Sequence, residues 1–483
     1  MTDPHLGDMD SNEFRKYGKQ LIDWIADYLE HDDRYPVFST VKPGEVKAQL
    51  PATPPPTPEA FDAILRDFND IILPGITHWN QPGFMGYFGI TGSMPGILGE
   101  LLTAGLNVNG MLWRTSPSAT ELEEVVLDWL RQMVGLPASF EGVIMDTASI
   151  SSLIAVAAAR EALNLHIREE GLAGRSEVPR LIMYTSEQAH SSIEKAGLAL
   201  GIGQANVRKI EVDAEFRLRP DRLAAAIEAD RRSGYRPFFA CATVGTTSTT
   251  SIDPVPAIAD ICERERVWLH VDGAYGGNAA IVPEMRWVLN GVERADSFVM
   301  NPHKWLFTPI DFSAFYTRHV ETLTRTFSIL PEYLRTREGD AHAVKNYMDY
   351  GVQLGRRFRA LKFWFIVRTY GVAGLIERLR AHIALAKQFE GWVQAAPDWE
   401  VVAPVYFSTV NFRACPRGVA EDQWNALNEK ILGAVNATGE VFLSHTKLNE
   451  RYIIHLAIGN IRTEEKHLAR AWALLQAECG RWA

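Results

Sequence analysis

The sequence predicts an α/β protein with a large domain built on parallel strands, a helical arm before it and a smaller α+β domain after it. Five short apolar runs each precede small or polar residues and then a helical segment: "GVIM" (142–145), "RLIMYT" (180–185), "FFACATV" (238–244), "VWLHVD" (267–272) and "SFVM" (297–300). Such runs, without alternation, are typical of parallel strands covered on both faces. Ligands of such sheets bind at the carboxyl ends of the strands.

The arm is expected over residues 1–82. Its apolar residues recur at steps of three and four and predict an amphipathic helix over residues 11–30: Phe14, Tyr17, Leu21, Ile25 and Tyr28. The stretch "PATPPPTP" (51–58) then forbids helix and favours an extended conformation. An arm that cannot bury its own apolar face is expected to pack on a neighbouring surface or a second subunit.

The large domain is expected over residues 83–354 and the small domain over residues 355–483. Within the large domain, Ser118 and Glu121 match a capping box and predict the start of a helix. After residue 355 helical segments mix with the apolar runs "TVNFRA" and "RYIIHLAI", which predicts a small α+β domain.

Composition excludes several classes of function. The net charge of -10 argues against a nucleic-acid partner, because such proteins usually carry a basic face. The four cysteines are far apart, without a C-x-x-C pair, so we expect no metal site and no disulfide framework. The start "MTDPHLGDMDSNEF" resembles no export signal, and no run approaches about 20 apolar residues. A cytoplasmic protein without a membrane span is expected.

Three sites at the ends of predicted strands could bind a flat ligand that carries a phosphate. Asp272 ends the run "VWLHVD" and is followed by glycines, which allow a flat ligand to approach the backbone. Ala148 and Ser149 stand at the start of a helix, where small residues and free N–H groups suit a phosphate. Thr247 lies in a second hydroxyl-rich turn. Each signal alone is more typical of helix capping than of a ligand site.

Two further side chains occur at the same predicted edge of the sheet. His190 follows a strand at the head of a helix, where it could cap the helix or stack on a planar heterocycle. Lys304 in "NPHKW" follows the run "SFVM". Most lysines are solvated charges, but burial lowers the pKa of a lysine and frees its amine to form an imine. A phosphate cup, a carboxylate for a ring nitrogen, a stacking imidazole and an imine-forming lysine are what pyridoxal 5'-phosphate requires.

At this point the chain resembles the group II pyridoxal-phosphate decarboxylases, specifically the aromatic-L-amino-acid decarboxylases. The resemblance runs over nearly the whole sequence through these motifs: "YGKQLIDWIADYLE", "SPSATELEEVVLDWL", "EQAHSSIEKAGL", "LHVDGAYGG", "ADSFVMNPHKWLF" and "LGRRFRALKFWF". It implies the type I pyridoxal-phosphate fold, with a mostly parallel seven-stranded sheet. It also implies a homodimer whose N-terminal helices pack on the other subunit.

The resemblance implies a role for individual residues. Lys304 is the expected imine-forming lysine, Asp272 the partner of the pyridinium nitrogen, and His190 the residue stacked on the ring. The expected phosphate and cofactor contacts are Ala148, Ser149, Thr247, Ala274, Asn301 and His303.

In the family a tyrosine on a mobile loop protonates the substrate carbon, and Tyr347 in "KNYMDYGVQLGRR" is the residue matched to it here. The other interpretation is that Tyr347 is a packed aromatic residue, because Tyr350 is close by. A tyrosine favours a simple decarboxylase, since phenylalanine resembles the replacement found in relatives that consume oxygen and release an aldehyde. The retained His190 also favours a simple decarboxylase.

The segments "HWNQPGFMGYFGITGS" and "NVNGMLWRTSP" resemble the family's substrate pocket. The expected substrate-binding residues are Trp79, Tyr87, Phe88, Met111 and Gly355. Proline and threonine commonly follow the Tyr-Phe pair in the family, but Gly89 and Ile90 stand here, and Met111 replaces a usual phenylalanine. Gly355 resembles members that accept indoles. Tryptophan, 5-hydroxytryptophan or dopa-like substrates are favoured, with tyrosine and phenylalanine still open.

Three alternatives remain at this stage. An aromatic aldehyde synthase would share most of these motifs. An aminotransferase would share Lys304 and Asp272 but needs an arginine for the substrate carboxylate. A non-enzymatic dimeric scaffold would not need the set of Lys304, Asp272, His190 and Tyr347.

Overall fold

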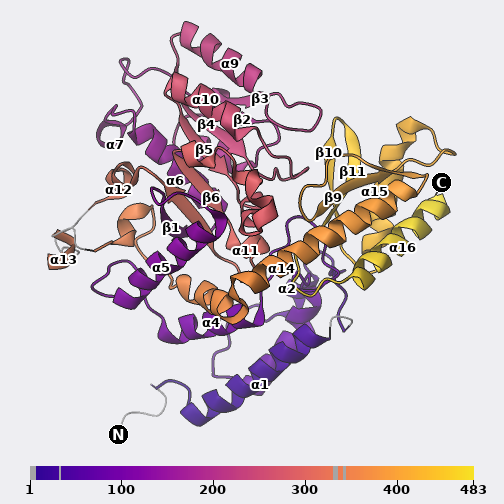
Figure 1. The fold of residues 1–483 in the computed structure, drawn as a ribbon. Coiled ribbons are helices and arrows are strands. Elements are labelled where there is room, and N and C mark those ends of the chain that lie inside the picture. Colours follow the sequence, from indigo (N-terminus) through magenta and orange to yellow (C-terminus); the bar gives the residue numbers. More distant parts are fainter. Residues whose placement is uncertain (1–6, 32–33, 330–335, 341–343, 483) are drawn as a thin grey trace.

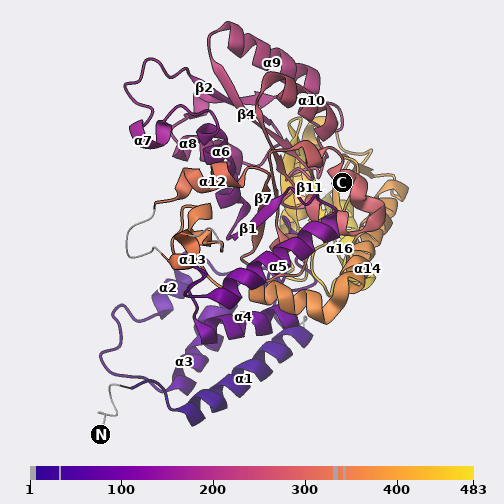
Figure 2. The same ribbon diagram turned by 60° about the vertical axis from the view of Figure 1, so that its left-hand side comes forward.

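The computed structural model describes residues 7–31, 34–329, 336–340 and 344–482. It shows a large sheet-containing domain, a smaller domain beside it and a helical arm that projects from the two (Figures 1 and 2). The described helices are α1 (Ser11–Glu30), α2 (Glu45–Gln49), α3 (Phe61–Asp67), α4 (Met94–Leu106), α5 (Pro117–Val134), α6 (Ala148–Glu161), α7 (Ile167–Glu170), α8 (Ser192–Ala199), α9 (Pro220–Arg232), α10 (Val255–Glu265), α11 (Pro302–Trp305), α12 (Val320–Phe327), α13 (Arg337–Asp340), α14 (Ala360–Ala395), α15 (Trp424–Ala437) and α16 (Glu465–Trp482). None of them carries an apolar stretch long enough to cross a bilayer.

The large domain is built on a seven-stranded sheet in the order β1-β7-β6-β5-β4-β2-β3. Its strands are β1 (Glu141–Met145), β2 (Leu181–Ser186), β3 (Val207–Ile210), β4 (Arg236–Thr243), β5 (Trp268–Asp272), β6 (Ser297–Met300) and β7 (Ser313–Thr317). All are parallel to their neighbours except β7, which is antiparallel to both β1 and β6. The five predicted strands are confirmed, whereas β3 and β7 were not predicted.

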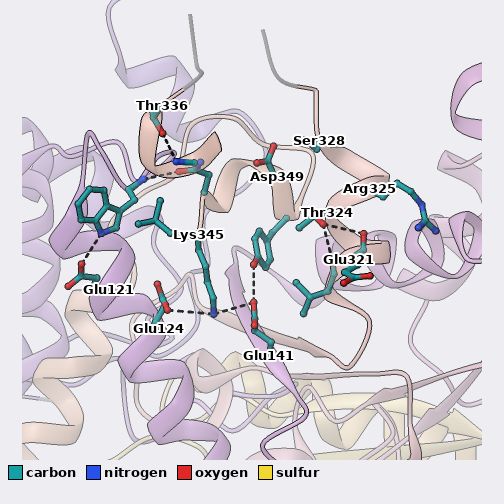
Figure 3. A pocket seen from close by; sticks show the side chains of 16 residues that line it. Glu121, Glu124, Glu141, Glu321, Thr324, Arg325, Ser328, Thr336, Lys345 and Asp349 are labelled. Atoms are coloured by element: carbon teal, nitrogen blue, oxygen red, sulfur yellow. Dashed lines mark hydrogen bonds and ion pairs between the residues drawn. The ribbon is translucent and has the colours of Figure 1, made fainter. Parts of the chain in front are cut away.

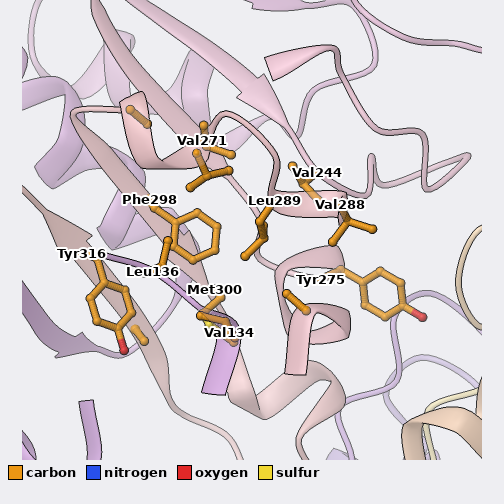
Figure 4. Close-up of a cluster of buried hydrophobic side chains, with 14 of the residues drawn as sticks. Val134, Leu136, Val244, Val271, Tyr275, Val288, Leu289, Phe298, Met300 and Tyr316 are labelled. Carbon is orange, nitrogen blue, oxygen red and sulfur yellow. The ribbon is translucent and has the colours of Figure 1, made fainter. Parts of the chain in front are cut away.

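Both faces of this sheet are covered, as continuous apolar strands require. On one face α6, α8 and α12 supply buried side chains such as Ile154, Ile193 and Leu323. On the other face α5, α9 and α10 supply Val126, Ile227 and others, together with the turns after β5. Figure 4 shows part of this second core, in which Tyr275 and Tyr316 are both buried.

The start of α5 differs from the predicted capping box. The helix begins at Pro117 with Ser116 as its N-cap, and Ser118 lies inside the first turn. Glu121 accepts a hydrogen bond from the indole N–H of Trp113 (2.8 Å) instead of closing a box. The prediction was wrong because Pro117, which is well suited to the first helical position, is the stronger start signal.

The small domain is an antiparallel sheet in the order β10-β11-β9-β8, covered by α15 and α16. Its strands are β8 (Trp399–Val401), β9 (Thr409–Ala414), β10 (Ser444–Leu448) and β11 (Arg451–Ala457). The runs "TVNFRA" and "RYIIHLAI" correspond to β9 and β11, so both expected strands are confirmed.

Helix α14 belongs to both domains. Its N-terminal part, which includes Phe363 and Leu379, lies in the core of the large domain and packs on α4 and α5. Its second half, with Ala386 and Val393, lies in the core of the small domain. A kink at Gly371, whose φ is 65°, interrupts the helix within its first half. The boundary at residue 355 stays a prediction, and it would place this whole helix in one domain.

The arm contains the predicted amphipathic helix, α1, with the expected bounds. Tyr17 packs on Phe61 with 4.3 Å between ring centroids, and Trp24 packs edge-on against Phe68 at 5.3 Å. Residues 51–58 form neither helix nor strand. Apolar side chains remain exposed on the arm and on the neighbouring α4: Phe14, Ile22, Ile64, Met94, Leu98, Leu101, Leu102 and Leu106.

Candidate active site

The central strands of the large sheet bring two predicted site residues together. Asp272 is the last residue of β5, and Lys304 lies in the short helix α11 that follows the adjacent strand β6. Because β5 and β6 are parallel neighbours, both side chains start from the same edge of the sheet.

Lys304 is a half-buried residue whose amine is desolvated and forms no ion pair among the described residues. Its Nζ lies 5.2 Å from the centre of the Phe88 ring. Burial lowers its pKa, and the charge of Asp272 opposes this shift. The amine therefore has the environment that a nucleophilic lysine needs.

Asp272 is held in place by the backbone that follows it. Only 4% of the residue is exposed, and its Oδ1 accepts the N–H of Ala274 at 3.0 Å. The carbonyl of Ala274 in turn accepts the N–H of Asn301 (3.0 Å). The turn after β5 and the turn after β6 are thus joined directly, and the predicted cofactor contacts Ala274 and Asn301 meet there.

His190 stands before α8 with a defined tautomer. Its Nδ1 accepts the backbone N–H of Ser192 (3.2 Å), which leaves Nε2 as the ring donor. Partial burial lowers its pKa; the charge of Asp272 raises it and that of Lys304 lowers it. Both groups are therefore close enough to act on the ring, and the structure gathers Lys304, Asp272 and His190 into one site.

A pair of hydrogen-bond donors lies beside the first turn of α6. His303 accepts the Phe312 N–H at Nδ1 (2.9 Å), and burial lowers its pKa to about 3, so the ring is neutral with its proton on Nε2. The amide Nδ2 of Asn301 lies 3.2 Å from this Nε2, because its Oδ1 already accepts the Ser313 hydroxyl (2.7 Å). Both side chains carry N–H groups that could donate to a phosphate oxygen at this point.

The same network reaches the predicted phosphate cup. Ser313 also contacts the hydroxyl of Ser151 in α6 (3.0 Å), so the donor pair adjoins the start of that helix. Ala148 and Ser149 form its first turn, where backbone N–H groups have no partner within the helix. Thr247 is exposed in the turn after β4. These donors, with the lysine and the carboxylate, fit pyridoxal 5'-phosphate. No metal-binding cluster of His, Cys, Asp or Glu occurs in the described ranges.

The predicted substrate residues form two groups. Phe88 is buried beside Lys304, whereas Tyr87 is 54% exposed and stacks on Trp79 with 5.7 Å between ring centroids. Met111 and Gly355 lie elsewhere, where the side chain of Asn109 approaches both of them. Within the described chain, no ring or hydrogen-bond contact joins this second group to Phe88 or Lys304.

Tyr347 is not brought to the other three catalytic candidates. It is 1% exposed in the short helix η8 (Tyr347–Tyr350), and Arg356 covers its ring at 4.7 Å. The charges that act on its hydroxyl are those of Glu123, Glu124 and Arg356, and burial raises its pKa well above the usual range. A role in proton transfer would require η8 to move, so the role predicted for Tyr347 stays a prediction.

Sequence reasoning missed Tyr275, an aromatic residue that adjoins the site next to Trp305. Tyr275 stacks on Phe88 with 3.9 Å between ring centroids, and on Trp305 at 5.0 Å. The signal was present in "DGAYGG", since a β-carbon on Gly276 would lie 2.6 Å from the Val244 carbonyl oxygen. Only glycine allows the turn after Tyr275 to pack so closely.

A hollow of about 1020 Å³ lies elsewhere, between α5, α12 and η8 (Figure 3). Its walls carry Glu121, Glu321 and Asp349, and Lys345 pairs there with Glu124 and Glu141. Its lining contains none of the residues that surround Lys304, so it is separate from the candidate site.

Comparison with known proteins agrees with this geometry. Residues 43–415 match the family described as "Pyridoxal-dependent decarboxylase conserved domain". Tyrosine decarboxylase 4 of Petroselinum crispum is 42% identical over 483 residues, covering 98% of this chain and 94% of its own length. Phenylacetaldehyde synthase of Arabidopsis thaliana is also 42% identical, over 481 residues, with 98% and 97% coverage.

A solved structure shows the same fold. The crystal structure of Oryza sativa TDC with PLP and tryptamine superimposes with a TM-score of 0.94 at 38% sequence identity. The match covers 100% of this chain and 99% of that one. The α/β architecture expected from the sequence is thus confirmed.

Proposed function

Because the chain belongs to the pyridoxal-dependent decarboxylase family, we propose that it decarboxylates aromatic L-amino acids to the arylalkylamine and carbon dioxide with pyridoxal 5'-phosphate. The observation that carries the proposal is the buried amine of Lys304, unpaired among the described residues and flanked by Asp272 and His190. A surface lysine or a lysine in an ion pair would lack this reactivity.

When bound, the cofactor supplies an electron sink for the pair of electrons left on the substrate carbon as carbon dioxide departs. Asp272 would hold a proton on the pyridine nitrogen, and each unit by which it raises that pKa stabilises the protonated ring by about 1.4 kcal/mol. Its fixed bond to the Ala274 N–H keeps the carboxylate oriented for this task.

The other residues bind and orient. Lys304 would attach the cofactor through its amine, whose pKa is lowered by burial, a shift that favours the neutral, nucleophilic form. His190 would stack on the ring and present its Nε2–H, since Nδ1 is engaged by Ser192. Asn301 and His303 would share a phosphate oxygen, and the N–H groups of Ala148 and Ser149, with Thr247, would complete the phosphate site.

Support for aromatic substrates comes from the relatives and from the site wall. The relatives include enzymes named for tyrosine and for phenylacetaldehyde, and a solved neighbour contains tryptamine. Phe88 places an apolar ring beside Lys304, and the flat side chain of a substrate could pack against it. The relative named phenylacetaldehyde synthase favours an aldehyde-forming reaction as the second candidate.

The exposed apolar residues of the arm and of α4 support a homodimer, because a patch of this kind on a single chain usually marks an interface. The four cysteines are unpaired thiols, which suits a reducing compartment such as the cytoplasm.

The test is a panel of aromatic amino acids offered to the enzyme with pyridoxal phosphate, scored for carbon dioxide, amine, aldehyde and hydrogen peroxide. The proposal expects amine and carbon dioxide in equal amounts, without peroxide. Aldehyde with peroxide would establish the second candidate instead. A new amino acid formed from pyruvate or 2-oxoglutarate, without carbon dioxide, would identify an aminotransferase and overturn both.

A further inference from the structure

Three aromatic rings form a continuous stack between the site and the small domain. Phe88, which lies 5.2 Å below the amine of Lys304, is nearly parallel to Tyr275, with an interplanar angle of 9°. Tyr275 is nearly parallel to Trp305, at 13°. Phe407 meets Tyr275 and Trp305 edge-on, with centroid distances of 5.9 and 6.1 Å. Trp305 is the residue after Lys304 in α11. The stack therefore meets the lysine at both ends, through Phe88 and through Trp305.

Two of the three rings, Tyr275 and Trp305, are each held by a hydrogen bond to a distant segment. The Ser408 hydroxyl donates to the Ile458 carbonyl (2.6 Å), so it accepts the Tyr275 hydroxyl at 2.5 Å. Burial raises the pKa of Tyr275 to about 12, which keeps this donor protonated. The indole N–H of Trp305 donates to His382 in α14 (3.0 Å).

Ser408 and Ile458 belong to the small domain, next to β9 and β11, and they are 133 and 183 residues away from Tyr275. The small domain therefore fixes the middle ring of a stack whose last ring faces the lysine. A displaced Tyr275 would release Phe88 on one side and Trp305 on the other, because each ring packs face to face on its neighbour.

We propose that Tyr275 is a positioning residue for Lys304, held by Ser408 of the small domain and acting through Phe88 and Trp305. The inference rests on the proposed function, since it concerns how the lysine is prepared to bind pyridoxal phosphate. Loosening the stack would let water reach the amine and increase the number of orientations that it samples. The charged and titratable groups around the amine, Asp272, His190 and His303, would stay unchanged.

The experiment measures how fast the apoprotein acquires the visible absorbance of lysine-bound pyridoxal phosphate, at fixed pH and cofactor concentration. Tyr275→Phe keeps the ring and removes the hydroxyl, whereas Ser408→Ala removes its acceptor. Loss of one buried hydrogen bond predicts that each variant acquires the absorbance about fivefold more slowly. The double variant should be no slower than the slower single variant, because both changes break the same bond.

Tyr316→Phe is the matched control. Tyr316 is also a buried tyrosine of the same core (Figure 4), and its hydroxyl donates to the Leu127 carbonyl at 2.8 Å, remote from the stack. It should lose stability in urea to a similar extent as Tyr275→Phe while acquiring the absorbance at the wild-type rate.

The outcomes distinguish a failure of the proposed function from a failure of the positioning role of Tyr275. Wild-type protein that never acquires the absorbance would overturn the proposed function itself. Wild-type absorbance together with equal rates for Tyr275→Phe and Tyr316→Phe would overturn only the positioning role. If Tyr275→Phe and Ser408→Ala slow the reaction independently, so that the double variant shows the product of their effects, the two changes do not act through the Tyr275–Ser408 hydrogen bond. That result would also overturn the positioning role.

Discussion

Lys362 is fully buried and Lys304 is half-buried, and desolvation lowers the pKa of each amine, yet their surroundings differ. Lys362 in α14 forms an ion pair with Glu100 of α4, and both Glu100 and Asp311 raise its pKa again. Lys304 has only the more distant charge of Asp272. Burial alone does not make a lysine reactive; a missing partner does.

The position of Lys362 explains why it is paired. A β-carbon on Gly99 of α4 would lie 2.6 Å from the Lys362 Cα, so the two helices pack closely at this point. Glu100 also pairs with Arg357 at 2.6 Å. The ammonium group of Lys362 is therefore part of the contact between α4 and α14. The amine of Lys304 has no such partner among the described residues.

The largest effect should follow from removing the unpaired amine. Lys304→Ala is expected to abolish carbon dioxide release and the visible absorbance of bound cofactor, while the protein stays folded. Lys362→Met is the matched control, since it also removes a buried ammonium group but should keep both signals. Residual turnover at the wild-type level in Lys304→Ala would exclude Lys304 as the attachment point.

The next largest effect is on the free energy of unfolding and concerns the ion pair of Lys362. Glu100→Gln leaves Lys362 buried without its carboxylate, which should lower the free energy of unfolding by on the order of 3 kcal/mol. Lys362→Met removes the charge and keeps an apolar side chain, so its cost should be within about 1 kcal/mol. Urea unfolding followed by fluorescence measures both. Equal losses in the two variants would show that packing, not pairing, is what matters at this contact.

The smallest contrast concerns a second unpaired group, the hydroxyl of Tyr347, which has no hydrogen-bond partner among the described residues. If Tyr347 is the proton donor, Tyr347→Phe should shift part of the product from amine to aldehyde, ammonia and hydrogen peroxide. If its enclosed position is also its working position, amine remains the product. A coupled peroxidase assay distinguishes the two.

Tyr333→Phe provides the comparison for this test. Tyr333 is a second tyrosine in the segment that precedes η8, and it lies outside the residues that the structure describes. Peroxide from Tyr333→Phe, with none from Tyr347→Phe, would move the proton-donor role to Tyr333.

Features encoded locally could be predicted from the sequence. Apolar runs predicted five of the seven large-sheet strands, and polar residues at the end of those runs or within five residues after them predicted Asp272, His190 and Lys304. The edge strand β3 was missed because its middle residues, Arg208 and Lys209, are charged; Lys209 is exposed and Arg208 pairs with Asp230. No short pattern marks β7 as antiparallel, because that depends on where its neighbours lie.

Contacts between distant segments could not be predicted in this way. Nothing near Tyr275 indicates that its hydroxyl meets Ser408, because only the folded chain brings them together. The same limit applies to the donor pair of Asn301 and His303, whose orientation depends on Ser313 and Phe312. The motif around Tyr347 was recognisable, but its burial beneath Arg356 was not.

The shared helix α14 has a consequence for exchanging parts between related enzymes. A chimera joined at residue 355 would carry Phe363, Ile366 and Leu379 into a foreign large domain, where they must fit a core that they did not evolve with. The change of core falls between Ile383, which packs on the large-domain core, and Leu385, which packs on the small-domain core. A crossover at this point of the helix would keep each core with its own side chains, so recombination should succeed inside the helix rather than at the loop before it.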